Sequence, residues 1–256
     1  MDMKRNKILS IGTVGAILII WFTVTSLNLV DSKLVPHPVA VVKALVEIIK
    51  NGYRNYTLLE HLFASLGRLL VALLMAILAG VPLGLYSGYN TKVKALLNPI
   101  IEFYRPLPPL AYYTILILWL GIDNSSKIVL LFLASFAPIY IACVSAVTKV
   151  KEDYMKSAYV VGANKKQVFF HVIFPACLPD IFVGLRTGLG VAYTTLVSSE
   201  MVAAKSGIGW MVLDASRNLR SDIIFLGIII MGITGILLDK GIQMIEFKLV
   251  PWKGKE

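Results

Sequence analysis

Long apolar stretches divide this chain, and their length constrains the fold more than any other feature. A helix needs roughly 20 apolar residues to cross a bilayer, and lipid cannot satisfy the polar groups of an open backbone. With 57% of the residues hydrophobic, the sequence therefore predicts an all-α polytopic membrane protein with one transmembrane domain over residues 1–256. The six predicted transmembrane helices are residues 8–30, 62–86, 98–121, 128–147, 181–204 and 223–243.

Basic residues predict the orientation of these spans. Lys4, Arg5 and Lys7 precede the first span, and positive charge favours the cytoplasmic side. The apolar run that follows is too long for the core of a typical signal peptide and has no clear cleavage site, so we expect a retained helix. Six spans then put both termini in the cytoplasm. The formal net charge of +10 fits basic cytosolic loops better than a nucleic-acid partner.

Residues 98–121 are the least regular of the predicted spans. Glu102, Arg105 and three prolines interrupt the first half, before a clean apolar run begins at Leu110. Prolines free backbone carbonyls that lipid cannot satisfy, so this half must be shielded by protein or face a watery cavity. We expect one bent helix that lines a path through the membrane.

The span at 181–204 carries two ionisable residues and two glycines. Arg186 and Glu200 lie about 21 Å apart along a straight helix, so they cannot pair with each other. Snorkelling, pairing with a neighbouring helix and contact with a transported solute all remain open for each of them. Gly184 and Gly188 form a small-xxx-small pair that favours close helix packing.

A polar segment, residues 151–175, separates the fourth and fifth predicted spans. The sequence predicts a short helix over residues 152–161, which ends at Gly162 because glycine accepts the left-handed conformation. Asn164 is expected to cap a second helix, with Gln167 in the capping-box position. We call this two-helix segment the elbow.

Two prolines, Pro175 and Pro179, are expected to end the elbow and to start the next span. Lysines along the elbow surround small residues, which would let the surface of another protein approach closely. Helix physics alone leaves a second interpretation open, in which the elbow is a solvated loop that binds nothing.

The sequence contains no catalytic constellation. It has no GxxxxGK[ST] phosphate loop, so we do not expect the chain to bind ATP by that route. His37, His61 and His171 fall on different predicted sides of the membrane, and Cys143 and Cys177 lack metal-ligand spacing. We therefore predict no catalytic residue, no metal site and no enzyme activity.

The elbow resembles a loop found in the permease subunits of bacterial ABC importers. That loop reads E-A-A-x3-G-x9-I-x-L-P, and this chain keeps Ala158, Gly162 and Pro175 with the same spacing. Val172 and Phe174 are apolar replacements at the two remaining apolar positions. In that family the loop forms a coupling helix that docks onto the ATP-binding subunit.

Two elbow positions depart from the family pattern. Lys156 stands where the family has glutamate, and Ser157 stands where it has alanine. The departures are compatible with docking, but they remove the salt bridge that an acidic residue would make. The docking residues implied by the resemblance are Tyr154, Lys156, Ser157, Ala158, Val161, Gly162 and Ala163.

The resemblance extends over nearly the whole chain from about Leu34 onward. Its motifs are similar to those of the nitrate/sulfonate/taurine branch of the family: LVPHP, NPIIEFYRPLPPLA, WLGI, GLR and EMVAAKSGIG, which begin at residues 34, 98, 119, 184 and 200. The EFYRP version of the proline segment and the closing Pro251-Trp252 are most similar to the taurine members.

Membership of this branch would imply a type I ABC importer permease that moves taurine or a related sulfonate into the cytoplasm by alternating access. It implies a second permease copy, two ATP-binding subunits that hold the ATP and magnesium, and an extracytoplasmic substrate-binding protein, in a bacterial plasma (inner) membrane. This chain itself would bind no cofactor. The candidate pathway residues are Arg186, Thr194, Thr195, Ser198, Ser199 and Glu200.

Other functions remain open at this stage. Relatives on similar frameworks carry nitrate, alkanesulfonates or vitamin precursors. An ion-coupled secondary transporter would need intramembrane acidic or broken-helix sites in repeated halves; Glu102 is the nearest candidate, and no repeat is visible. A membrane scaffold that transports nothing would tolerate loss of the small residues in the elbow.

Overall fold

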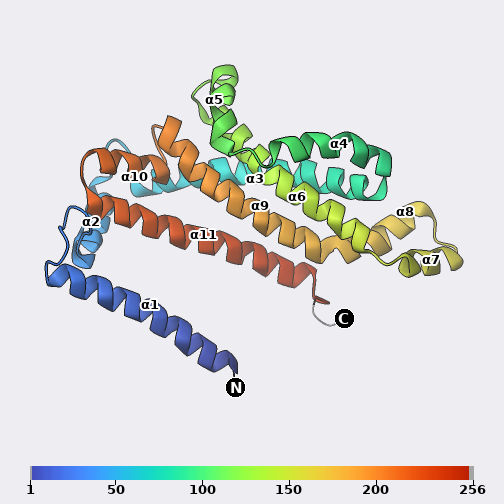
Figure 1. The fold of residues 1–256 in the computed structure, drawn as a ribbon, viewed down its shortest axis with the longest axis horizontal. Coiled ribbons are helices and arrows are strands. Elements are labelled where there is room, and N and C mark those ends of the chain that lie inside the picture. Colours follow the sequence, from blue (N-terminus) through green and yellow to red (C-terminus); the bar gives the residue numbers. More distant parts are fainter. Residues whose placement is uncertain (1, 254–256) are drawn as a thin grey trace.

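The structure, a computed structural model, describes residues 2–253, and all its regular elements in that range are helices (Figure 1). The elbow lies at one end of the elongated molecule, and α2 and α10 lie at the other (Figure 1). The elements are α1 (Asp2–Ser26), α2 (Pro38–Asn51), α3 (Leu58–Tyr89), α4 (Thr91–Tyr104), α5 (Pro109–Leu120), α6 (Asn124–Lys149), α7 (Glu152–Val160), α8 (Lys165–Val168), the π-helix η1 (Phe169–Ile173), α9 (Phe174–Ala203), α10 (Ile208–Arg217) and α11 (Ser221–Leu249).

Four helices in the described range are long and apolar enough to cross a membrane. They are α3, α6, α11 and the continuous run Lys165–Ala203 that α8, η1 and α9 form together. Two shorter apolar helices, Gly12–Ser26 within α1 and Pro109–Leu120, lie where the first and third spans were predicted. The prediction of an all-α polytopic membrane fold is confirmed.

The core of the molecule lies where α3, α6 and α9 pack together. The two predicted packing glycines of α9 face α6, because a Cβ added at Gly184 would lie 2.5 Å from the Cβ of Ala142. A Cβ at Gly188 would lie 3.0 Å from Ile139 Cγ1. The absence of side chains at these two positions lets the helices approach closely, as predicted.

The prediction of one bent helix over residues 98–121 is wrong. The structure divides the segment into α4, which ends at Tyr104, and α5, which begins at Pro109. Pro106, Pro108 and Pro109 have no backbone N–H, and three prolines in four residues cannot continue a helix. Figure 1 shows α4 lying along α3 while α5 projects away from the bundle.

The prediction that Pro175 and Pro179 end the elbow is also wrong. Pro175 lies in the first turn of α9, and Pro179 lies inside that helix. Before them, Phe174 N–H donates to the carbonyl of Phe169, which makes the wider turn of a π-helix. A π-turn relieves the contact between a proline ring and the preceding turn. The elbow therefore continues into α9 without a break.

Candidate functional site

The elbow is built from two short helices that meet at a left-handed glycine. The helix α7 ends just before Gly162, which has φ +88°. The capping box predicted for α8 is present: Gln167 N–H donates to Asn164 Oδ1 (3.0 Å), and Asn164 N–H donates to Gln167 Oε1 (2.8 Å). Both local predictions are confirmed, and the two caps give the elbow a defined shape.

One side of the elbow is anchored and the other is free. Met155, Ala158 and Ala163 pack against the core formed by α3, α6 and α9. On the outer side Val160 and Val161 are 87% and 84% exposed. Two neighbouring valines at the tip of a polar segment form an apolar surface suited to another protein.

Lys156, the lysine that stands where the family has glutamate, forms an ion pair within α7. Lys156 Nζ lies 2.8 Å from Glu152 Oε2, and both side chains are exposed. The hydrogen bond and the charge of Lys156 lower the pKa of Glu152. An exposed pair of this kind contributes little to stability, so both residues are free to exchange partners when a second surface arrives.

The predicted docking residues lie together on the elbow. Tyr154, Lys156, Ser157, Val161 and Gly162 are exposed, whereas Ala158 and Ala163 are half-buried at the base. No heavy atom within 4 Å would meet a Cβ added at Gly162, so the chain requires glycine there for its backbone conformation and not for space.

The predicted pathway residues do not form one surface. Thr194 is exposed and Ser198 is partly exposed, whereas Thr195 and Ser199 are buried. Each of the four hydroxyls donates to a carbonyl of its own helix at 2.8–3.1 Å. Arg186 instead pairs with Asp239 of α11, at 2.7 Å from Nε to Oδ1.

Glu200 lies at the other end of α9 in a buried polar cluster. Its carboxylate accepts hydrogen bonds from Arg68 Nη1 (2.6 Å), Ser65 Oγ (2.8 Å) and the backbone N–H of Gly209 (2.9 Å). Glu200 and Arg68 are 1% and 7% exposed. Glu200 thus binds α3 and the start of α10 to the end of α9.

The same cluster continues through Arg68, which sequence reasoning did not select as a site residue. Its Nε donates to Asn124 Oδ1 (2.7 Å) and its Nη1 to the carbonyl of Ser206 (3.0 Å). Nearby, Ser65 Oγ accepts the N–H of Ile208 (2.9 Å). The sequence does show an arginine inside an apolar helix, and such a residue requires a partner. Glu200 is 132 residues away in the chain, so the sequence did not indicate which residue that partner is.

A family model described as "Binding-protein-dependent transport system inner membrane component" matches residues 80–250, which include the elbow and the Glu200 end of α9. The chain belongs to this family. As a family member it is a multi-pass inner membrane component with a transport role, and a binding protein is part of the system to which such components belong.

Individual family members match along nearly their whole length. The taurine transport system permease protein TauC of Escherichia coli (strain K12) is 41% identical over 254 residues, 99% of this chain and 92% of that protein. The putative aliphatic sulfonates transport permease protein SsuC of Bacillus subtilis (strain 168) is 33% identical, with 93% and 85% covered. The nitrate import permease protein NrtB of Synechocystis sp. is 32% identical, with 94% and 89% covered.

A solved structure has the same fold as this family member. It is titled "Inward facing conformations of the MetNI methionine ABC transporter: CY5 SeMet soak crystal form", and it aligns with a TM-score of 0.59 over 76% of this chain and 94% of that one. At 17% identity the likeness shows the shared architecture of the helices.

Proposed function

We propose that this chain is the membrane-spanning subunit of an ATP-driven importer that carries taurine or a closely related sulfonate. The observation that carries the proposal is the 41% identity with TauC over 99% of the chain. The similar sulfonate and nitrate permeases are less identical. Nitrate, alkanesulfonates and vitamin precursors are the alternative cargoes.

In this proposal the elbow docks onto an ATP-binding subunit, which holds the ATP and the magnesium. The exposed Val160 and Val161 enter a groove of that subunit, and Tyr154 and Lys156 contact its rim. Two copies of this chain and two ATP-binding subunits form the complex, and an extracytoplasmic binding protein delivers the solute. The apolar tip on an anchored polar segment supports this role.

The continuous helix Lys165–Ala203 connects the elbow to the membrane-spanning part of the chain. It can therefore transmit a movement of the ATP-binding subunit to the spans. Its 39 residues extend about 58 Å at 1.5 Å per residue. A displacement of the elbow therefore moves the start of α9 directly, and the opposite end of that helix is held by Glu200 and Arg68. A stiff element with fixed contacts at both ends is suited to exchange inward- and outward-facing states.

The proposed docking of the elbow onto the ATP-binding subunit also sets the orientation of this chain in the membrane. ATP-binding subunits act in the cytoplasm, so the elbow must lie there. The start of α1 and the end of α11 point away from α2 and α10 (Figure 1), which supports cytoplasmic positions for both termini. Of the candidate pathway residues, Thr194 and Ser198 keep their proposed role, because they are accessible at the surface of α9.

The deciding experiment is uptake of labelled taurine into vesicles that contain this chain, its ATP-binding subunit and its binding protein. ATP-dependent uptake that nitrate and ethanesulfonate compete poorly supports a taurine importer. Uptake of nitrate or ethanesulfonate in place of taurine moves the cargo to another branch of the family. Uptake that follows an ion gradient without ATP refutes the importer.

A matched pair of glycine variants tests the docking separately. Gly162 and Gly121 both have positive φ, +88° and +82°, and neither has a neighbour within 4 Å of an added Cβ. Valine at either position introduces the same kind of backbone strain, about 1–3 kcal/mol. We expect Gly162→Val to weaken assembly with the ATP-binding subunit or to uncouple ATP hydrolysis from uptake. If Gly121→Val does so equally, the elbow has no special role.

A further inference from the structure

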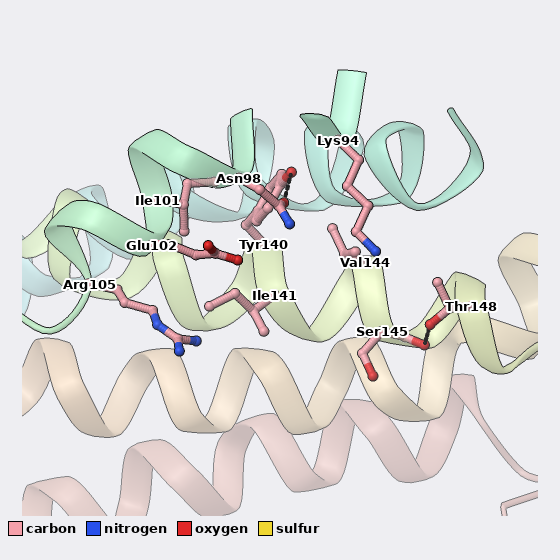
Figure 2. A pocket seen from close by; sticks show the side chains of 10 residues that line it. All are labelled: Lys94, Asn98, Ile101, Glu102, Arg105, Tyr140, Ile141, Val144, Ser145 and Thr148. Atoms are coloured by element: carbon pink, nitrogen blue, oxygen red, sulfur yellow. Dashed lines mark hydrogen bonds between the residues drawn. The ribbon is translucent and has the colours of Figure 1, made fainter. Parts of the chain in front are cut away.

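A polar cavity of about 270 Å³ lies between α4 and α6. Figure 2 shows the side chains of α4 pointing down into it from one side and those of α6 forming the other side. The lining residues from α4 are Lys94, Asn98, Ile101, Glu102 and Arg105, and those from α6 are Tyr140, Ile141, Val144, Ser145 and Thr148. The cavity has the size of a site for a small solute, since pockets for drug-sized ligands begin at about 300 Å³.

The polar residues of α4 share one helical face. Lys94, Asn98, Glu102 and Arg105 recur at intervals of four, four and three residues, which places them in one row. The apolar side chains Leu96, Ile100 and Phe103 lie on the remaining surface and are 63–75% exposed. The helix therefore turns this polar row toward α6 and its large apolar groups away from the bundle, which suits a hydrated space next to lipid.

The three charges in the row have no partner in the described part of the chain. The side chains of Lys94, Glu102 and Arg105 form neither a hydrogen bond nor an ion pair there, whereas Arg68, Arg186 and Glu200 are each paired. Asn98 Oδ1 accepts a hydrogen bond from Tyr140 Oη (3.2 Å), which directs the amide N–H groups of Asn98 toward the cavity (Figure 2). Glu102 and Arg105 are exposed to this space, so a ligand that carries charges of both signs can pair with both of them and with the donor amide.

The cavity is one of three that follow the same face of α6. A second cavity shares Arg105 and Ile141 with it and extends to Tyr112 and Val191. A third shares Ile141 and Ser145 and extends toward the elbow end, to Lys149 and Asp180. The unpaired charges therefore lie beside a groove that follows α6, and not on an isolated patch of surface.

We propose that this cavity binds a zwitterionic aminosulfonate, with Arg105 on the sulfonate and Glu102 on the ammonium group. The proposal rests on the proposed function and names the residues of this chain that distinguish the cargo. A guanidinium offers a fork of donors to two sulfonate oxygens, and a carboxylate accepts from an ammonium group. Lys94 and the amide of Asn98 add donors on the sulfonate side.

Glu102 is the residue that makes this prediction specific. An anion without an ammonium group, such as nitrate or ethanesulfonate, gains nothing from Glu102 and is repelled by it. Taurine carries both charges on a short chain and can satisfy Arg105 and Glu102 together. Selection by the permease itself would add to any selection by the binding protein.

The test measures binding of labelled taurine to the complex of this chain with its ATP-binding subunit in nanodiscs, without nucleotide or binding protein. Unlabelled taurine and ethanesulfonate are the competitors. We expect Arg105→Gln to weaken taurine binding by about tenfold or more, because a charged hydrogen-bonded contact is lost. We expect Glu102→Gln to weaken taurine binding similarly and to make ethanesulfonate an equal competitor.

Control variants separate the site from general damage. Lys92 is an exposed residue of the same helix that does not line the cavity, so Lys92→Gln should bind as the unchanged chain does. Arg105→Lys should retain part of the affinity. All variants should elute as the same assembled complex.

Failure of the site assignment can be distinguished from failure of the proposed cargo. If the unchanged complex takes up taurine in vesicles but neither Glu102→Gln nor Arg105→Gln differs from Lys92→Gln in binding and competition, the site assignment is overturned. If the unchanged complex takes up no taurine at all, the proposed cargo fails first, and this inference fails with it.

Discussion

The buried pair of Arg68 and Glu200 gives the sharpest test of how this fold is held together. In Arg68→Met the side chain keeps much of its length and loses its charge and donors. The Glu200 carboxylate, 1% exposed, then retains only the hydrogen bonds from Ser65 and Gly209. Asn124 and Ser206 also lose the guanidinium to which they bond.

The expected magnitude follows from the burial of both groups. Removing one partner of a buried ion pair costs about 3–5 kcal/mol, because the remaining charge is left uncompensated. For a chain of 150–250 residues each 1 kcal/mol lowers the melting temperature by about 2–4 °C. Arg68→Met should therefore melt roughly 6–20 °C lower than the unchanged chain.

The assay is thermal unfolding in detergent, with a double-mutant cycle and a surface control. Arg68→Met combined with Glu200→Leu removes both charges and should recover most of the loss. Arg54→Met breaks a pair with Asp214 in which Arg54 is 52% exposed, and it should cost less than about 1 kcal/mol. The reasoning is refuted if Arg68→Met costs no more than Arg54→Met, or if the double variant is as unstable as the sum of the single ones.

Three further predictions concern the elbow, the helix packing and the segment between α2 and α3. Val161→Asp should leave the melting temperature of the chain almost unchanged and abolish co-purification with the ATP-binding subunit; normal co-purification would contradict the docking surface. Gly184→Val should destabilise the chain by about 1–3 kcal/mol in thermal unfolding, whereas Gly190→Ala, with nothing within 4 Å, should stabilise it by about 0.5–1 kcal/mol. Burial and the hydrogen bond to Asp214 (2.7 Å) raise the pKa of Tyr53 to about 12, so its contribution to stability is complete below pH of about 10 and is lost as the pH rises through about 12. An ultraviolet difference titration against Tyr53→Phe checks this, and a tyrosine that titrates near pH 10 would be inconsistent with it.

Features set by neighbours in the sequence were predictable. Gly162 ends α7 in the left-handed conformation, and Asn164 and Gln167 form the capping box, because each of these effects acts within a few residues. The pair of glycines at Gly184 and Gly188 indicated close packing, although not the identity of the helix that approaches.

Two predictions about prolines, both made from neighbouring residues alone, were wrong. Pro175 was expected to stop a helix, but the π-turn before it accommodates the ring and carries the elbow into α9. The prolines at 106–109 were expected to bend a single span, but their number breaks it, and α5 leaves the direction of α4. The hydrophobic pattern of the sequence is the same for one bent helix and for two separate helices, so it could not have distinguished them.

By itself, the sequence determined that this chain is a helical membrane protein with a capped polar elbow and a family resemblance along most of its length. Apolar length, glycine conformation and capping depend on residues close together in the chain, and they can be recognised without coordinates. Only the tertiary structure decided that Glu200 pairs with Arg68 of α3, that Arg186 pairs with Asp239 of α11, and that the charges of α4 face α6. A charge in a nonpolar surrounding must find a partner, but packing of distant helices selects which one it finds.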